Sequence, residues 1–250
     1  MEKALYYGLL TFFLTGLGAS LIFLTRGNPR KFLSLSLGFA GGVMVSASFF
    51  SLILPSIKIF GEGSIISALK LSFGFILGVA ILRLLDIITP HLHPGVTSLE
   101  KEGPAIQLKK SVLLFLAVTI HNIPEGLAVG VSLTLELALA IGIQNIPEGL
   151  ALALALALAF RAAGLSKFQS FFYGFVSAIV EPIFSLLGAF LIDISKFLLP
   201  YAMSLAAGAM IFVVIEEILP TAQKLENPDF ASLGFGIGFL SMLILDAGLG

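Results

Sequence analysis

Two short polar segments of nearly identical sequence stand in an otherwise apolar part of the chain. Residues 121–128 read HNIPEGLA, and residues 144–151 read QNIPEGLA. Imidazole, amide and carboxylate groups are ligands of divalent metal ions. Because ionisable groups inside a membrane segment are costly, they mark a functional site by default. The duplicated segments therefore predict a metal-binding pair of helices.

Helical spacing places the polar groups of each segment on one face. His121 and Glu125 are four residues apart, as are Gln144 and Glu148, and residues so spaced are neighbours on a helix. If the two helices are antiparallel and joined near residues 134–136, a rise of ~1.5 Å per residue puts His121 ~21 Å and Glu148 ~19 Å from the turn. The same rise puts Glu125 ~15 Å and Gln144 ~13 Å from it. In a hydrocarbon core ~30 Å thick, we expect His121 beside Glu148 and Glu125 beside Gln144, near the midplane.

A third carboxylate occurs in a later apolar segment, in the pair Glu181-Pro182. Three carboxylates in one site could not all be ionised without a cation between them. Two divalent ions bridged by Glu125 and Glu148 would remove that repulsion, and we expect Glu181 to complete the site. A single polar residue beside a proline in a membrane helix is often only a packing feature, but two matched copies argue against that interpretation.

The elements that carry these residues are predicted to be transmembrane helices. The chain of 250 residues is 58% hydrophobic and 12% charged, which is not the composition of a soluble domain. Eight apolar segments are long enough to span a bilayer as α-helices. Their ranges are about 4–25, 34–54, 64–88, 111–133, 136–160, 169–192, 197–219 and 230–249. We therefore expect residues 1–250 to form one all-α transmembrane domain.

The distribution of lysine and arginine predicts the orientation, because cytoplasmic loops carry an excess of these residues. The loops at one end of the predicted helices, including a longer linker over about 89–110, hold Arg26, Arg30, Lys31, Lys101, Lys109, Lys110, Arg161, Lys167 and Lys224. The other end holds only Lys3, Lys58 and Lys196. We therefore expect the first end in the cytoplasm and both termini outside the cell membrane.

Charge and residue usage exclude several partners. A formal net charge of −1 without a basic patch offers no surface for nucleic acid. The sequence contains no nucleotide-binding loop. It also contains no cysteine, which excludes disulfides and thiolate metal sites. Divalent ions and the lipid bilayer are the expected partners.

With these features the sequence resembles the ZIP family of divalent metal transporters, and within it the GufA-type branch. HNIPEG at 121–126, QNIPEG at 144–149 and Glu181-Pro182 carry the resemblance, which extends over essentially the whole chain. It implies eight helices, with helices 1–3 and 6–8 related as an inverted repeat around helices 4 and 5. It also implies ion import into the cytoplasm by an elevator-type movement of helices 1, 4, 5 and 6 against a scaffold of helices 2, 3, 7 and 8 in a homodimer.

The resemblance implies a binuclear site that holds two zinc or other divalent ions per protomer, for which Cd²⁺ is a usable surrogate. One ion would be bound by His121, Glu125, Gln144 and Glu148, with Met44 from helix 2 nearby. The other would be bound by Asn122, Glu125, Asn145, Glu148 and Glu181. Asn145 stands where some family members carry Asp, which removes a negative charge from the second site.

Secondary sites along the ion pathway are also implied. On the cytoplasmic side these are Asp86, His91, His93, Glu216 and Glu217, and on the outer side Asp246. Asp86, the two histidines and Asp246 are equally compatible with solvated charges at helix ends. For Glu216 and Glu217 we expect a functional role, because two adjacent acids before Pro220 would otherwise be a costly pair. Arg83, close to Asp86 in sequence, is expected to be an interfacial side chain or an ion-pair partner.

Two other functions stay open from the residues alone. A membrane-bound di-metal carboxylate enzyme would use Glu-x-x-His on paired helices, a motif that does not occur here, and neither does the His-Glu-x-x-His of zinc proteases. A proton-coupled solute carrier would explain the intramembrane Glu residues but not the duplicated His, Gln and Asn. We therefore expect a transporter rather than an enzyme. Nitrogen and oxygen ligands suit Zn²⁺, Fe²⁺, Mn²⁺, Co²⁺, Ni²⁺ and Cd²⁺, and the usual affinity order favours Zn²⁺ over Fe²⁺ and Mn²⁺.

Overall fold

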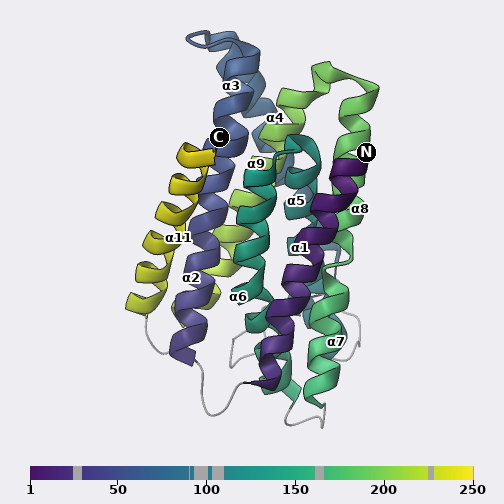
Figure 1. Ribbon diagram of the computed structural model, residues 1–250, viewed down its shortest axis with the longest axis vertical. Helices are drawn as coiled ribbons and strands as arrows, with labels where there is room; N and C mark the ends of the chain where they lie inside the picture. Colours follow the sequence, from purple (N-terminus) through teal and green to yellow (C-terminus); the bar gives the residue numbers. More distant parts are fainter. Residues whose placement is uncertain are drawn as a thin grey trace.

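A computed structural model describes residues 1–24, 30–89, 91–92, 101–102, 110–160, 166–224 and 228–249. These residues form an elongated bundle of helices, with both termini toward one end (Figure 1). The α-helices are α1 (Glu2–Ser20), α2 (Arg30–Ala47), α3 (Leu54–Phe60), α4 (Ile65–Ile88), α5 (Lys110–Ser132), α6 (Leu135–Phe160), α7 (Lys167–Ser177), α8 (Val180–Ile194), α9 (Leu199–Val213), α10 (Leu219–Lys224) and α11 (Pro228–Leu249). Short 3₁₀ turns follow α1 (Leu21–Phe23) and precede α9 (Lys196–Leu198).

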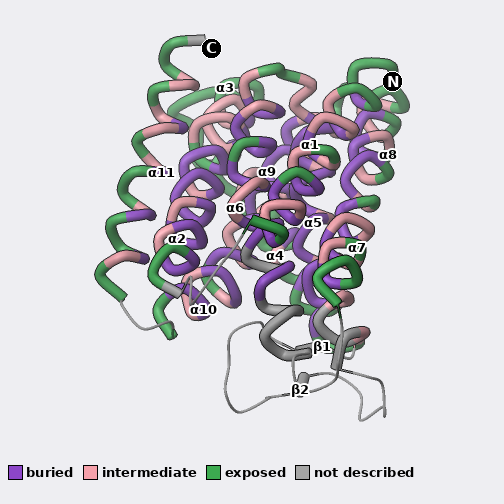
Figure 2. The backbone as a smooth tube through the Cα atoms, turned by 60° about the horizontal axis from the view of Figure 1, so that its bottom comes forward, coloured by how far each residue is buried: buried purple, intermediate pink, exposed green. Residues whose placement is uncertain are grey.

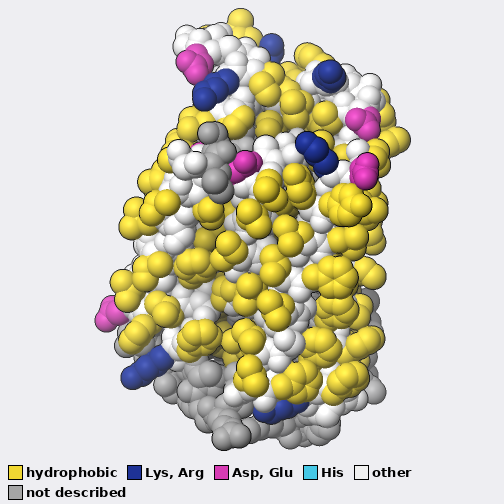
Figure 3. Space-filling model, in the orientation of Figure 1, with side chains coloured by type: hydrophobic (Ala, Val, Ile, Leu, Met, Phe, Trp, Pro, Cys, Tyr) yellow, Lys and Arg dark blue, Asp and Glu magenta, His cyan; other side chains and the backbone are white. Residues whose placement is uncertain are grey.

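The helices are long and apolar, as expected for a multi-pass membrane protein. Among the described residues, six helical stretches meet the length and hydropathy of a membrane span: Glu2–Phe23, Lys31–Phe60, Ile65–Ile88, Lys167–Ile194, Lys196–Lys224 and Pro228–Gly248. Helices α5 and α6, of 23 and 26 residues, pack among them and carry the two polar segments. Hydrophobic side chains cover the middle of the molecular surface, while charged side chains gather toward its ends (Figure 3).

Each predicted range is helical, but three contain irregularities that the sequence analysis did not predict. The second and seventh predicted helices pass through π-helical turns at Ser48–Ile53 and Val214–Ile218, and they end later than predicted, at Phe60 and Lys224. Pro55 and Pro220 follow these turns, at the second position of α3 and of α10. The sixth predicted helix is interrupted between α7 and α8.

The predicted linker over 89–110 departs from an all-α description. Strand β1 (His91–Leu92) pairs with β2 (Lys101–Glu102) in an antiparallel ladder, with His91 opposite Glu102. The sequence between the strands holds Pro and Gly, which disfavour a helix. Pairing of two short extended pieces satisfies backbone groups that a helix would otherwise have satisfied.

The helices pack as two groups. In the first group, α1 packs along α6 and α8, and α5 packs along α8, with α7 against α1 and α6. In the second group, α2 packs along α11 and α4 along α9, with α3 and α10 against them. The groups meet mainly where α2 contacts α6 and where α5 contacts α9. The polar residues of α5 and α6 therefore lie in helices that touch the second group.

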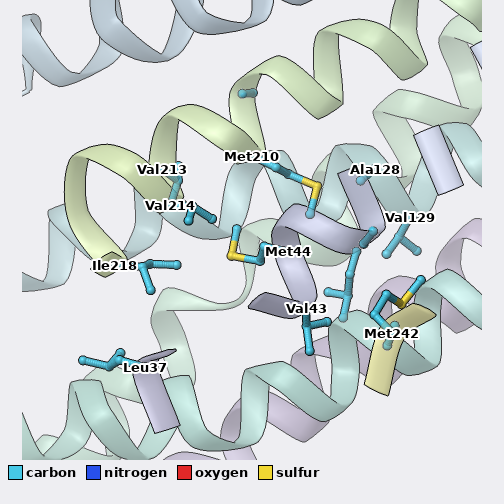
Figure 4. Close-up of a cluster of buried hydrophobic side chains, with 14 of the residues drawn as sticks. Leu37, Val43, Met44, Ala128, Val129, Met210, Val213, Val214, Ile218 and Met242 are labelled. Carbon is cyan, nitrogen blue, oxygen red and sulfur yellow. The ribbon is translucent and has the colours of Figure 1, made fainter. Parts of the chain in front are cut away.

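Buried residues concentrate in the centre of the bundle, whereas the outer faces of peripheral helices such as α11 are exposed (Figure 2). Part of the core joins the two groups. Val43 and Met44 of α2, Met210 of α9 and Met242 of α11 lie in one cluster with Val129 of α5 (Figure 4). These are flexible or branched apolar side chains, so this part of the junction is held by side-chain packing rather than by polar bonds.

Candidate metal centre

Helices α5 and α6 bring the two polar segments together. They form an antiparallel pair joined at residues 133–134, as the depth estimate from the sequence assumed. Although the surrounding segments are apolar, the six polar side chains predicted there are all buried: His121, Asn122 and Glu125 on α5, and Gln144, Asn145 and Glu148 on α6. Polar groups buried in this way need partners within the protein or a bound ligand.

Helix α8 supplies the third carboxylate. The chain turns at 178–179, and the backbone N–H of Glu181 donates to the carbonyl of Ala178 at 2.9 Å. Glu181 therefore stands in the first turn of α8, fully buried. The positive end of the helix dipole favours a carboxylate at this position. The break in the predicted sixth helix thus places Glu181 at the start of α8, inside the helical bundle.

Glu125 and Gln144 are directly bonded. Gln144 Nε2 donates to Glu125 Oε1 at 2.7 Å, which agrees with their predicted depths. His121 and Glu148 are close enough to interact electrostatically, but His121 Nε2 contacts Glu217 Oε2, on the π-helical turn after α9. This contact joins the first group of helices to the second at the level of the polar segments.

A second network surrounds Glu181. Asn145 Nδ2 donates to Glu181 Oε2 at 3.2 Å and to Thr15 Oγ1 at 3.0 Å. The Thr15 hydroxyl in turn donates to Glu181 Oε1 at 2.8 Å. Gln144 Nε2 donates to Asn145 Oδ1 at 2.7 Å and so connects the two networks. Thr15 of α1 was not among the predicted site residues. Its signal was Thr11 and Thr15, four residues apart in an apolar helix and both buried.

Several buried polar atoms have no hydrogen-bond partner within the described part of the chain. They include Glu125 Oε2, Gln144 Oε1, Glu148 Oε2 and Asn122 Nδ2. An unsatisfied buried acceptor costs about 1–3 kcal/mol. Three of these atoms are oxygens from the set that the family resemblance implies for the first ion, so this set has acceptor atoms available for a cation.

The predicted ligands lie close together, but they do not surround a single point as the ligands of a metal ion would. Among the residues that the structure describes, no three His, Asp or Glu side chains are arranged so that they could hold a metal ion between them. The contact of His121 with Glu217 accounts for part of this, because it directs the imidazole nitrogen to the second group of helices. An ion bound through His121 Nε2 would take the place of this contact with Glu217.

Met44 has a packing role in this structure. Its side chain is fully buried in α2, in the apolar cluster that contains Met210 and Val214 (Figure 4). Its backbone carbonyl accepts a hydrogen bond from Ser48 at 2.7 Å. A thioether contact with a bound ion stays a prediction for this residue.

The secondary residues divide between the two ends. Asp86 is buried and forms an ion pair with Arg83 at 2.6 Å, and Arg83 lies 3.6 Å from Glu216. The predicted ion-pair role of Arg83 is therefore confirmed. Asp246 accepts a hydrogen bond from Ser51 at 2.9 Å. His93 and the side chain of His91 lie outside the described residues.

Comparison with known proteins identifies the family. Residues 91–246 match the family model described as ZIP zinc transporter. The chain is 36% identical to the zinc transporter GufA of Myxococcus xanthus over the full length of both proteins. It is 35% identical to the zinc transporter ZIP11 of Bos taurus, covering 100% of this chain and 98% of that protein. It is 31% identical to the zinc transporter ZupT of Clostridium perfringens, covering 92% of this chain and 90% of that protein. Matches of this extent, together with the duplicated polar segments on α5 and α6, show that the chain belongs to the ZIP family of zinc transporters.

Proposed function

We propose that this chain transports zinc and related divalent ions across a cell membrane into the cytoplasm, and that it binds them at His121, Glu125, Gln144 and Glu148. The similarity to zinc transporters supports zinc as the ion. The observation that carries the proposed site is the set of three buried oxygen atoms, on Glu125, Gln144 and Glu148, that lack hydrogen-bond partners among the described residues. A cation shared by these atoms would offset the cost of burying them.

The proposed architecture is one domain of eight spans in which helices 1–3 and 6–8 form an inverted repeat. Two helices of the second group support this, because α2 continues through a π-helical turn to the sequence Ile-Leu-Pro at 53–55, and α9 does the same at 218–220. The packing partners correspond as well. Helix α2 packs along α11 as α9 packs along α4, and α1 packs along α6 as α8 packs along α5. Transporters with inverted repeats bind substrate near the midplane.

The proposed movement is an elevator displacement of the first group of helices against the second. Glycines support this division. Within each group, an added Cβ on several glycines would overlap the backbone of a neighbouring helix, and these glycines are Gly18, Gly126, Gly130 and Gly149 in the first group and Gly38, Gly42, Gly78, Gly208, Gly234 and Gly238 in the second. Such close backbone approach holds membrane helices firmly together.

None of the described glycines has a neighbouring atom of the other group close to its added Cβ. The groups instead meet through side chains, such as those of Met44, Met210 and Val129. A groove between α2, α6 and α11 also opens at this boundary, beside Pro147. Each group can therefore move as a unit while only side-chain contacts are exchanged, and the second group would be the scaffold that pairs with another protomer.

Zinc uptake into proteoliposomes tests the site. With a zinc-sensitive dye inside the vesicles, we expect His121→Ala and Glu148→Ala to reduce the initial uptake rate to that of protein-free vesicles. Glu62→Ala is the matched control for Glu148→Ala, because Glu62 is exposed in the turn before α4. It is expected to retain the wild-type rate.

Two results would contradict the proposal in different ways. Uptake near the wild-type rate in Glu148→Ala would mean that the ion is bound elsewhere. Failure of the wild-type protein to admit any divalent ion would reject transport itself. The orientation is tested separately in cells, because the chain has no cysteine and a single Lys3→Cys substitution is expected to react with an impermeant thiol reagent from outside.

A further inference from the structure

We infer that the midplane site of this chain holds one divalent ion rather than two, because Thr15 and Asn145 bond to Glu181 where a second ion would bind. The inference rests on the proposed function and narrows it. It assigns Glu181, Asn145 and the previously unassigned Thr15 to a protein-internal network, and it leaves His121, Glu125, Gln144 and Glu148 as the ion-binding set. The resemblance to the family had implied two ions.

The polar atoms of Glu181 and Asn145 are all engaged by the protein. Glu181 Oε1 faces the Thr15 hydroxyl at 2.8 Å, and Glu181 Oε2 accepts from Asn145 Nδ2 at 3.2 Å. Asn145 Oδ1 accepts from Gln144 Nε2 at 2.7 Å. Both residues are buried, at 0% and 1% exposure, so water does not compete for these bonds.

The donors in this network have a fixed direction. Gln144 Nε2 donates to Glu125 Oε1 at 2.7 Å. Because a carboxylate oxygen accepts, the Gln144 NH₂ group is the end of the amide that faces Glu125, and the same NH₂ group donates to Asn145. Asn145 Oδ1 therefore faces Gln144, and the Asn145 NH₂ group faces Thr15 and Glu181. An amide NH₂ has no lone pair to offer a metal ion. Reversing the Asn145 amide would place its oxygen against the Glu181 carboxylate and its nitrogen against the Gln144 nitrogen.

The two predicted ion sites therefore differ in whether their polar atoms are already hydrogen-bonded within the protein. In the first, Glu125 Oε2, Gln144 Oε1 and Glu148 Oε2 have no hydrogen-bond partner among the described residues. In the second, the NH₂ group of Asn145 provides the positive side of a dipole next to Glu181, as a cation would. An Asp at position 145 would replace this donor by a negatively charged acceptor, which suits a second cation and repels Glu181 without one.

Zinc stoichiometry measures the number of ions directly. Purified protein in nanodiscs is dialysed against zinc, and bound zinc is counted per protomer by mass spectrometry. The zinc retained by the His121→Ala/Glu148→Ala double variant is subtracted, which removes ions bound outside the midplane. We expect a difference of one ion for the wild-type protein and two for Asn145→Asp. Thr15→Val, which removes a donor without adding charge, is the matched control and is expected to bind one.

Each result tests either the single-ion inference or the proposed function on which it rests. A difference of two ions in the wild-type protein would overturn the single-ion inference and leave the proposed transport intact. One ion in both the wild-type protein and Asn145→Asp would overturn the role given to Asn145. A difference of zero in the wild-type protein would reject the midplane site itself, and with it the proposed function.

A measurement on the unmodified chain covers the case in which Asn145→Asp does not fold. Two-metal sites hold their ions about 3.5–4 Å apart, so cadmium-loaded protein with two ions would give a metal–metal signal at that distance in X-ray absorption. With a single bound ion, we expect a signal only from the light ligand atoms around cadmium. A cadmium–cadmium signal that disappears in Glu148→Ala would contradict the inference.

Discussion

Replacing Thr15 by valine removes one buried hydroxyl while keeping the shape of the side chain. In the wild-type protein Thr15 Oγ1 bonds to Glu181 Oε1 at 2.8 Å and accepts from Asn145 Nδ2 at 3.0 Å. After the change, Asn145 still reaches Glu181 Oε2 at 3.2 Å. Glu181 Oε1 loses the donor from Thr15, and it stays buried because valine fills the same volume.

The expected loss follows from the burial of the acceptor. A buried acceptor that loses its partner costs about 1–3 kcal/mol, whereas polar pairs between membrane helices average nearer ~0.6 kcal/mol. Because Glu181 is fully buried, the estimate lies between these values and near the upper one, at about 2 kcal/mol. For a chain of this length, that corresponds to a fall in melting temperature of roughly 4–8 °C.

The assay is thermal unfolding of purified protein in nanodiscs without added metal. Thr119→Val is the matched control, because Thr119 Oγ1 donates to the carbonyl of Phe115 on its own helix, at 2.7 Å. Thr15→Ser, which keeps the hydroxyl, should recover much of the loss. If Thr15→Val melted at the temperature of Thr119→Val, the network around Glu181 would not stabilise the first group of helices and the reasoning would fail.

Gly234→Ala should destabilise the protein by about 1–3 kcal/mol through overpacking, because the added Cβ would overlap the backbone of Leu35. Gly236→Ala, two residues along the same helix, is the control. Its added Cβ meets nothing within 4 Å, so this variant should melt like the wild-type protein. Equal melting temperatures for the two variants would contradict the backbone packing of α2 on α11. Arg83→Gln should cost about 1 kcal/mol, since Arg83 is 48% exposed and its ion pair with buried Asp86 is partly screened. The double variant Arg83→Gln/Asp86→Asn should recover that loss, and a double variant as unstable as the sum of the two single variants would mean that the pair does not interact.

Much of the helical architecture was predictable because it depends on local composition. A bilayer requires long apolar segments whose backbone bonds are satisfied internally, so each predicted range is helical in the structure. The irregular turns were not predictable in the same way. The π-helical turn at Val214–Ile218 and the break before Val180 depend on which side chain must face which neighbouring helix, and hydropathy carries no such information.

The pairing of Glu125 with Gln144 was also predictable. In an antiparallel pair of helices, the number of residues from the connecting turn gives the depth of a residue on either helix, and these two residues have similar depths. The partner of His121 was not predictable. Its contact with Glu217 joins residues far apart in sequence, and only the packing of α5 against α9 brings them together. Thr15 was missed for the same reason. Its spacing from Thr11 puts both on one helix face, but only the packing of the helices shows that Glu181 lies opposite Thr15.

By itself, the sequence determined that the chain lies in a membrane and that two matched polar segments meet at one depth, because helix rise and apolar length are properties of each segment alone. Only the tertiary structure decided how the polar atoms are shared. It bonds Asn145 and Thr15 to Glu181 and leaves oxygens of Glu125, Gln144 and Glu148 without hydrogen-bond partners among the described residues. The physical reason is that a buried donor must find an acceptor on whichever helix is packed beside it, and that choice is made by packing and not by spacing.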